Sequence, residues 1–340
     1  MLNPIQIGNI TISNPVFLAP MAGTSTLPFR KICYEHGAGL CTTELTSARS
    51  ILYNGLSKSF RYMRIDPKAE GITSIQLFGS EKEDFTNAIS QICNDELLGQ
   101  VSIIDINMGC PVPKVVKTGA GCALMKNPKA AFDIAYASVK EASKYGKPVT
   151  IKTRIGYSQE KDNGVEFVKH LAQSGIAGLC VHGRYGTQMY HGVANVEVIA
   201  SMRKSICNVK IPFIANGDIT DGPSAKNMIE KTEADAISIG RAAAGNPWIF
   251  QEISSFLVGD SYTKPSSGDR IAMFWRELNE ACSLQDETVA VKEMRGQMSS
   301  YLKGIVGSSK VRSALCTALT RDQVRAILEE NYGKMSFDKP

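Results

Sequence analysis

The sequence predicts a closed (β/α)8 barrel, the TIM-barrel fold of the α/β class, followed by a small C-terminal helical bundle. Three observations predict it: eight short β-branched apolar runs, segments of helix length between them, and a tail without strand-like runs. An open doubly wound sheet is the alternative. Such a sheet usually has fewer strands and a GxGxxG sequence after the first one, whereas APMAG follows the first run here.

The expected strands begin at intervals of roughly 23 to 47 residues, which leaves room for a helix in each interval. They are Val16–Ala19, Gly39–Glu44, Thr73–Phe78, Ser102–Asn107, Val149–Thr153, Gly178–His182, Ile211–Ala215 and Ala234–Ile239. In a barrel of parallel strands, the carboxyl ends meet at one mouth. We therefore expect the polar residues that end these runs to lie close together.

A Gly/Ser/Pro-rich stretch divides the chain after the eighth unit. We expect residues 1–258 to form the barrel, 259–268 a linker and 269–340 a helical domain. Apolar residues recur at helical spacing in the last segment. On a helix from residue 292 to residue 303, two faces are expected: a basic one with Lys292, Arg295 and Lys303, and an apolar one with Met294, Met298 and Leu302.

The composition, with 43% hydrophobic and 21% charged residues, is that of a globular protein. No apolar run approaches the ~20 residues of a membrane span, and the N-terminal residues lack a signal-peptide pattern, so we expect a cytoplasmic protein without membrane attachment. The nine cysteines form no CxxC pair, which argues against a metal site or a disulfide framework. The oligomeric state stays open, and a monomer is compatible with the sequence.

Positive charge is concentrated in two segments. Residues 110–154 hold nine Lys or Arg against two Asp or Glu, and residues 292–312 hold five against one. Local excesses of this size favour a polyanionic partner, although a solvated basic surface is the alternative.

The segment NMGCPVPKVVKTGAGCAL runs from Asn107 to Leu124 and places Cys110 just after the fourth strand. A cysteine between glycine and proline is held on a shaped loop, here at the expected barrel mouth. The loop that follows is glycine-rich and basic, as a mobile lid would be. Both a structural and a reactive cysteine fit this position.

Taken together, several motifs resemble those of the tRNA-dihydrouridine synthases, most closely the bacterial B-type branch. The motifs are the N-x-G-C-P loop, APMAG, IQLFG, IKTRIG, VHGR, NGDI and IGRAAAGNPWIF, and each follows or ends an expected strand. The resemblance runs from about Ile5 to Phe250 and more loosely through the tail. It implies that NADPH (or NADH) reduces bound FMN. The flavin N5 then delivers hydride to C6 of a tRNA uridine, and Cys110 protonates C5.

The resemblance also implies a set of FMN contacts. Pro20, Met21 and Ala22 would pack on the flavin ring, and Gln76 would bind its pyrimidine edge. Lys152 would lie against the ring, where a buried lysine needs a negative partner. His182 would lie near the ring or the phosphate. Phosphate would be held at the ends of the seventh and eighth strands by Asn216, Gly217, Asp218, Gly240 and Arg241.

Contacts to the substrate RNA are expected from Asn107, Arg154, Arg184, Lys292 and Arg295. Two departures from the family pattern bear on these. The segment after the sixth strand reads HGRYGTQMYHG, where relatives more often have HGRT followed by an arginine. The tail has Gln297 where many relatives have histidine.

Two other functions compete with this one. A flavin barrel enzyme acting on small molecules, such as a dihydroorotate dehydrogenase or an ene-reductase, would explain the phosphate sites but not the basic segments. A non-catalytic RNA-binding protein would explain the charge but leave Cys110 and Lys152 without a role.

Overall fold

The computed structural model describes residues 3–160 and 162–333, so the ends of the predicted barrel and helical domains, residues 1–2 and 334–340, lie outside the described residues. The predicted TIM barrel is confirmed, because eight parallel strands form a closed sheet in which β4 also pairs with β6. The strands are β3 (Val16–Leu18), β4 (Leu40–Thr42), β6 (Thr73–Phe78), β7 (Ile103–Met108), β8 (Val149–Arg154), β9 (Gly178–His182), β10 (Phe213–Asn216) and β11 (Ala236–Ile239).

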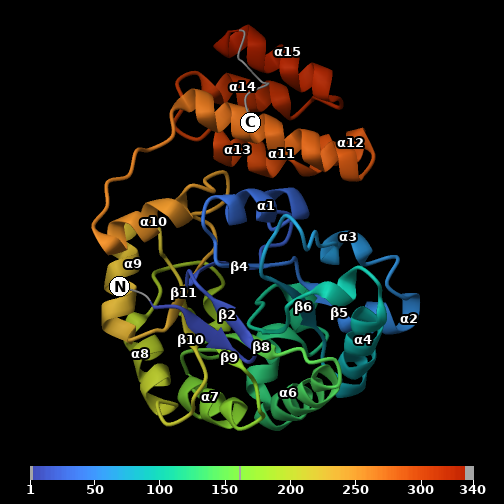
Figure 1. Ribbon diagram of the computed structural model, residues 1–340, viewed down its shortest axis with the longest axis vertical. Coiled ribbons are helices and arrows are strands. Elements are labelled where there is room, and N and C mark those ends of the chain that lie inside the picture. The colour runs from blue at the N-terminus through green and yellow to red at the C-terminus, as the bar shows by residue number, and fades with distance from the viewer. Residues whose placement is uncertain (1–2, 161, 334–340) are drawn as a thin grey trace.

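A ring of helices surrounds these strands (Figure 1). The helices are α1 (Leu27–Glu35), α2 (Ala48–Asn54), α3 (Phe60–Met63), α4 (Lys82–Asn94), α6 (Pro128–Ser143), α7 (Gly164–Ala172), α8 (Val196–Ser205), α9 (Gly222–Thr232) and α10 (Ile249–Val258). Side chains that alternate along each strand, such as Ile104 and Ile106, are buried beneath the helices. Side-chain caps begin several helices; Asn127, for example, accepts a hydrogen bond from Ala130 N at the start of α6.

Short elements lie in the connecting loops. They are β5 (Thr46–Ser47), η1 (Leu98–Gln100), α5 (Pro113–Val116), η2 (Gly121–Lys126) and η3 (Gly186–Gln188). β5 pairs with β6 beyond the end of β4, which extends the barrel wall at that point. α5 and η2 form the loop after β7, which the sequence marked as glycine-rich and basic.

An antiparallel hairpin precedes the barrel and was not predicted. It consists of β1 (Ile5–Ile7) and β2 (Ile10–Ile12), and Gly8 takes a positive φ of 59° in its turn. Ile7 and Ile12 are fully buried and pack in one cluster with residues at the amino ends of the barrel strands: Phe17, Leu40, Ile103, Ile214 and Ala236. The hairpin therefore covers the end of the barrel opposite the mouth.

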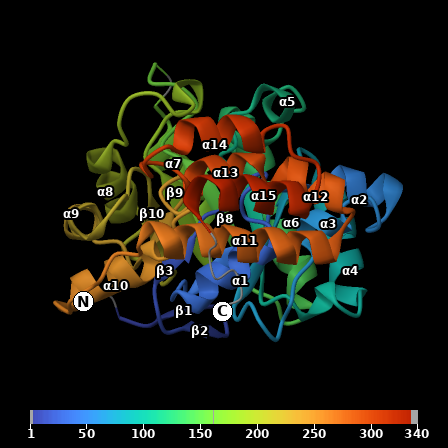
Figure 2. The ribbon, with the colours of Figure 1, turned by 90° about the horizontal axis from the view of Figure 1, so that it is seen from above.

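The C-terminal helices predicted by the sequence are present. They are α11 (Ser267–Leu284), α12 (Glu287–Glu293), α13 (Arg295–Tyr301), α14 (Ser308–Leu315) and α15 (Arg321–Tyr332). They surround a second apolar core, to which the barrel contributes Trp248. Figure 1 shows this bundle to one side of the barrel, next to α1, and Figure 2 looks at the molecule from the bundle side. Among the described residues, no helix is long and apolar enough to cross a membrane.

The single helix expected from residue 292 to residue 303 is wrong. α12 ends at Glu293, α13 begins at Arg295, and Lys303 lies beyond the end of α13. The three basic residues therefore share no helical face. The apolar part of the prediction is correct, since Met294, Met298 and Leu302 are all buried in the core of the bundle.

Candidate functional site

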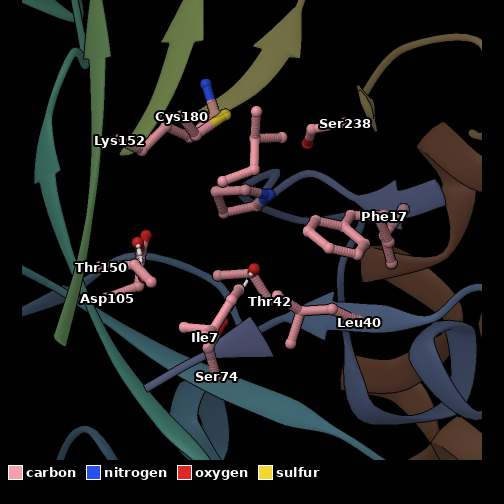
Figure 3. Close-up of a pocket in the computed structure, with 13 residues that line it drawn as sticks. Ile7, Phe17, Leu40, Thr42, Ser74, Asp105, Thr150, Lys152, Cys180 and Ser238 are labelled. Carbon is pink, nitrogen blue, oxygen red and sulfur yellow. Dashed lines mark hydrogen bonds between the residues drawn. The ribbon is translucent and has the colours of Figure 1, made fainter. Parts of the chain in front are cut away.

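The polar residues that end the barrel strands lie around one mouth, because all eight strands point the same way. The barrel interior beneath them is also polar. A cavity of about 30 Å³ lies inside the barrel (Figure 3). It is lined by Pro20, by apolar residues and by the polar residues Thr42, Ser74, Asp105, Thr150, Lys152, Cys180 and Ser238. The cavity has enough room for water. Polar and apolar side chains therefore both face a small cavity in the barrel interior.

A chain of hydrogen bonds connects this interior with the cysteine loop. Gln76 is fully buried and donates through Nε2 to Asp105 Oδ2 at 2.6 Å. Its Oε1 accepts from Asn107 Nδ2 at 2.9 Å. Asn107 Oδ1 in turn accepts from Cys110 N at 2.8 Å and Gly109 N at 3.2 Å. Gln76 and Asn107 thus hold the loop that carries Cys110.

Cys110 is half-buried at the start of that loop. Burial raises the pKa of its thiol, and the nearby charges of Arg154 and Lys152 oppose the rise. The thiol is therefore protonated at neutral pH, which suits a proton donor. The adjacent chain is closely packed, since a Cβ on Gly121 would lie 2.5 Å from the Cys110 carbonyl oxygen.

Lys152 points into the barrel from β8 (Figure 3) and donates to Asn216 Oδ1 at 3.1 Å. Asn216 is itself fixed, because its Nδ2 donates to the Ser238 carbonyl at 2.7 Å. Burial lowers the pKa of Lys152. Its hydrogen-bond partner is thus an amide. Among the described residues no carboxylate lies within ion-pair distance of Lys152, although the charge of Asp105 acts on its pKa at longer range.

Asp218, after β10, binds two of the predicted arginines. Its carboxylate accepts from Arg184 Nη2 at 2.8 Å and from Arg241 Nη2 at 2.9 Å. Burial raises its pKa, but the hydrogen bonds from Arg184 and Ala194 and the charges of the two arginines outweigh burial and lower it overall. Arg241 stays 58% exposed at the end of β11, where it can still reach an anion.

Arg184 is only 2% exposed, and its guanidinium is occupied within the protein. Besides Asp218, it donates to the carbonyls of His191 and Gly192. These contacts hold the β9–α8 loop, and the expected contact of Arg184 with RNA stays a prediction. His182 lies beside it, with Nε2 3.4 Å from Arg184 Nη1, and burial lowers the pKa of the imidazole.

Arg154, also predicted to contact RNA, is 2% exposed. It donates to the carbonyls of Gly109, Tyr185 and Met189, so it ties the cysteine loop to the β9–α8 loop. Tyr190 was not predicted from the sequence, and its half-exposed ring lies 5.7 Å from the Arg154 guanidinium and 5.4 Å from that of Arg241. An exposed aromatic ring flanked by two arginines is suited to stacking on a nucleobase.

The β3–α1 loop carries Pro20, Met21 and Ala22 and joins the mouth to the helical bundle. A Cβ on Gly240 would lie 3.8 Å from Met21 Sδ, so this loop adjoins the end of β11. Glu44 accepts from Gly23 N at 2.6 Å.

Gln297, noted as a departure from the family pattern, donates from α13 to the Thr24 carbonyl of that loop at 3.2 Å. A cavity of about 360 Å³ lies between this loop, α3, α11 and α12. The bundle therefore reaches the edge of the mouth.

The two tail residues predicted to contact RNA differ in their surroundings. Lys292 is exposed on α12. Arg295 is partly buried and donates to the Ala318 carbonyl at 3.1 Å, so it also contributes to the packing of the bundle. Lys292 is the more exposed of the two, and both RNA contacts stay predictions.

The chain matches the family model described as dihydrouridine synthase over residues 17–335. It is 34% identical to the tRNA-dihydrouridine synthase B of Pasteurella multocida, covering 96% of this chain and 95% of that protein. It is 40% identical to that of Proteus vulgaris, covering 74% and 75%.

Solved structures with the same fold include a morphinone reductase variant in complex with tetrahydroNAD. Its TM-score is 0.55 at 13% identity, covering 79% of this chain and 93% of that one. A Rhizobium histamine dehydrogenase has a TM-score of 0.58 at 13% identity, covering 88% and 50%. Likenesses at this identity concern the fold alone. The match of the family model over most of the chain and the identity to its relatives lead to one conclusion: the chain belongs to the dihydrouridine synthase family.

Proposed function

We propose that this protein is an FMN-dependent, NADPH-driven tRNA-dihydrouridine synthase that reduces the C5=C6 bond of specific uridines in tRNA. The observation that carries the proposal is the presence at one barrel mouth of two half-buried groups, the protonated thiol of Cys110 and the amine of Lys152. Family membership supports the substrate.

The residues at the mouth fit a flavin mononucleotide. Lys152 is half-buried and hydrogen-bonds only to the Asn216 amide among the described residues, so an electron-rich flavin ring would give its charge a negative partner. Arg241 is exposed beside Gly240, whose missing side chain leaves the backbone open to a phosphate. Asp218 would hold Arg241 in place rather than bind the phosphate itself, because two anions repel. A bound flavin would supply the two electrons that reduction of the double bond requires.

The protein's own residues would orient the uracil and move one proton. Cys110 would donate its proton to C5, and Asn107 and Arg154 would keep the cysteine loop in place. Tyr190 would stack on a base held at the mouth. A uridine within folded tRNA must leave its stack to reach this depth. The basic segment 110–154 and the proposed tRNA-binding domain, residues 269–340, would hold the RNA backbone meanwhile.

The test is made with purified protein and tRNA from a strain that lacks the gene. We expect bound flavin, released as FMN, and tRNA-dependent oxidation of NADPH. Position-resolved mapping of dihydrouridine should show new modification at defined positions. Already modified tRNA is the control and should not stimulate oxidation. Flavin-dependent reduction of small enones without any dihydrouridine would instead indicate a small-molecule reductase, and protein without flavin would indicate a binding protein.

A further inference from the structure

Asp105 has no role in the function proposed above, yet it is a carboxylate buried in the barrel. It lies on β7, two residues before Asn107, and is 6% exposed. Its Oδ1 accepts from Thr150 Oγ1 at 2.5 Å, and its Oδ2 accepts from Gln76 Nε2 at 2.6 Å. Figure 3 shows it pointing with Thr150 into the barrel below the level of Lys152. A charge at this depth is costly unless it is needed.

The chain of hydrogen bonds that begins at Asp105 has only one possible direction. A carboxylate can only accept, so Gln76 must present its NH2 group to Asp105 and its oxygen to Asn107. The backbone N–H groups of Gly109 and Cys110 can only donate, so Asn107 must turn its oxygen toward them. The two ends of the chain therefore fix the orientation of both side-chain amides, each of which could otherwise flip.

We propose that Asp105 is a positioning residue that acts through Gln76 and Asn107 to set the geometry of the loop carrying Cys110. The effect on catalysis rests on the proposed function of Cys110; the effect on the loop does not. The loop runs close to β8, because a Cβ on Gly109 would lie 3.1 Å from the Thr153 carbonyl carbon.

The ionised form of Asp105 suits this role. Burial raises its pKa to about 6, while the hydrogen bonds from Thr150 and Gln76 and the charge of Lys152 oppose the rise. The carboxyl is thus an acceptor-only group at neutral pH. Replacing it with an amide keeps one acceptor oxygen but loses the charge, and replacing it with a hydrocarbon of similar size loses the acceptor altogether. The two replacements separate positioning from simple filling of space.

The first readout is the rate at which iodoacetamide labels Cys110 in the flavin-loaded protein without tRNA, measured by mass spectrometry against the exposed Cys207. In Asp105→Leu the loop loses its anchor, and we expect labelling of Cys110 to rise about tenfold, as the loss of one buried hydrogen bond would allow. In Asp105→Asn we expect a rise of no more than about threefold, since a neutral hydrogen bond is weaker but still present. Ser74→Ala is the matched control. It removes the interior hydrogen bond from Ser74 to Thr42, which does not belong to the series of hydrogen bonds from Asp105 to Cys110, and it should leave labelling of Cys110 unchanged.

The second readout is the rate at which tRNA reoxidises the reduced flavin. It should fall in Asp105→Leu and recover largely in Asp105→Asn, while reduction by NADPH stays normal in both. If Asp105→Leu does not fold, Gln76→Met is the second variant. It removes the next side chain in the series of hydrogen bonds between Asp105 and Cys110 and should give the same increase in Cys110 labelling. Unchanged labelling in folded Asp105→Leu or Gln76→Met would overturn the proposal, as would an Asn variant that behaves like the Leu variant. If labelling changes as expected but Cys110→Ala keeps full tRNA turnover, the positioning role stands and the proposed role of Cys110 fails.

Discussion

The barrel mouth and the junction between barrel and bundle use charged residues in opposite ways. At the mouth, Arg154 and Arg184 are each 2% exposed and donate mainly to backbone carbonyls. At the junction, Arg276 pairs with Glu35 and Arg61 with Glu293, with side chains between 36% and 50% exposed. The first pattern holds loops in one geometry, while the second joins two surfaces through contacts that water and salt can weaken.

The difference assigns different tasks to the two regions. Transfer of a proton to one carbon needs groups that are already in place before the substrate arrives. Docking of a large polyanion needs total charge more than fixed geometry. We therefore expect substitutions at the mouth to change rates strongly and substitutions in the bundle to change affinity, salt dependence or stability more modestly.

The largest effect is expected from Cys110→Ala. Loss of one positioned acid typically costs ~100- to 10,000-fold in rate. The variant should still bleach its flavin with NADPH, yet fail to recover the oxidised spectrum when tRNA is added, in a stopped-flow experiment. Cys207→Ala, which removes an exposed thiol, serves as the control. Near-normal reoxidation by tRNA would remove Cys110 from the mechanism.

Lys152→Met should come next, because it removes the buried cation of the mouth while keeping its apolar length. We expect turnover to fall roughly 10- to 100-fold, the range for losing one charged hydrogen-bonding partner in a buried site. The flavin reduction potential should also become more negative, as measured by dye-linked reduction. A slower enzyme with an unchanged potential would mean that the lysine serves the RNA or the fold instead.

A moderate effect is expected from Glu277→Gln, in the core between α11 and α13. Glu277 is fully buried, accepts from Tyr301 Oη at 2.7 Å and leaves its Oε1 without a partner. Burial raises its pKa from 4.5 to about 8. Because the folded chain then holds this proton more tightly than the unfolded chain, the stability it supports is complete below pH 4.5 and is lost as pH rises toward about 8.

The glutamine variant carries no such proton, so its melting temperature should exceed that of the unmodified protein at pH 8 by on the order of 3 °C. The advantage should vanish near pH 5. Glu280→Gln on the same helix is the control, since Glu280 pairs with Lys31 near the surface and should give no gain at pH 8. Equal melting shifts at both pH values would show that the Glu277 proton is not linked to folding.

The smallest effect is expected in the tail, where two basic residues close in sequence differ in burial. Lys292→Ala should weaken tRNA binding a few-fold and lower the salt slope of the affinity by about one unit, with an unchanged melting temperature. Arg295→Ala should instead lower the melting temperature, because it removes the donor to the Ala318 carbonyl. Identical salt slopes in all three proteins would assign RNA binding to the barrel alone.

The accuracy of prediction from the sequence also differs between parts of the molecule. Buried parallel strands are short apolar runs, so all eight were found with end errors of at most two residues; the eighth, expected from Ala234, begins at Ala236. The position of the cysteine loop and the gathering of the strand-end residues at one mouth could be predicted from the order of the strands. The break at Met294 has no proline or glycine at that position to mark it. The β1–β2 hairpin does have a sequence signal, Gly8-Asn9 between two Ile-x-Ile repeats.

The roles of individual charged residues could not be predicted, because they depend on partners distant in sequence. Arg184 acquires its role from Asp218, and Arg154 from carbonyls on two other loops. Asp105 was read as part of an apolar strand, and only the positions of Gln76 and Thr150 on the neighbouring strands reveal its function as an acceptor.

The hairpin at the amino end has a consequence for how the interior exchanges protons with water. Because Ile7 and Ile12 are buried at that end and Ile7 lines the interior cavity, we expect solvent to reach the interior from the mouth. Any molecule that fills the mouth would then isolate the hydroxyl, amide and ammonium hydrogens of Thr150, Gln76 and Lys152 from bulk solvent. Their exchange with deuterium would slow together on binding, and the extent of that slowing would report how completely a ligand closes the barrel.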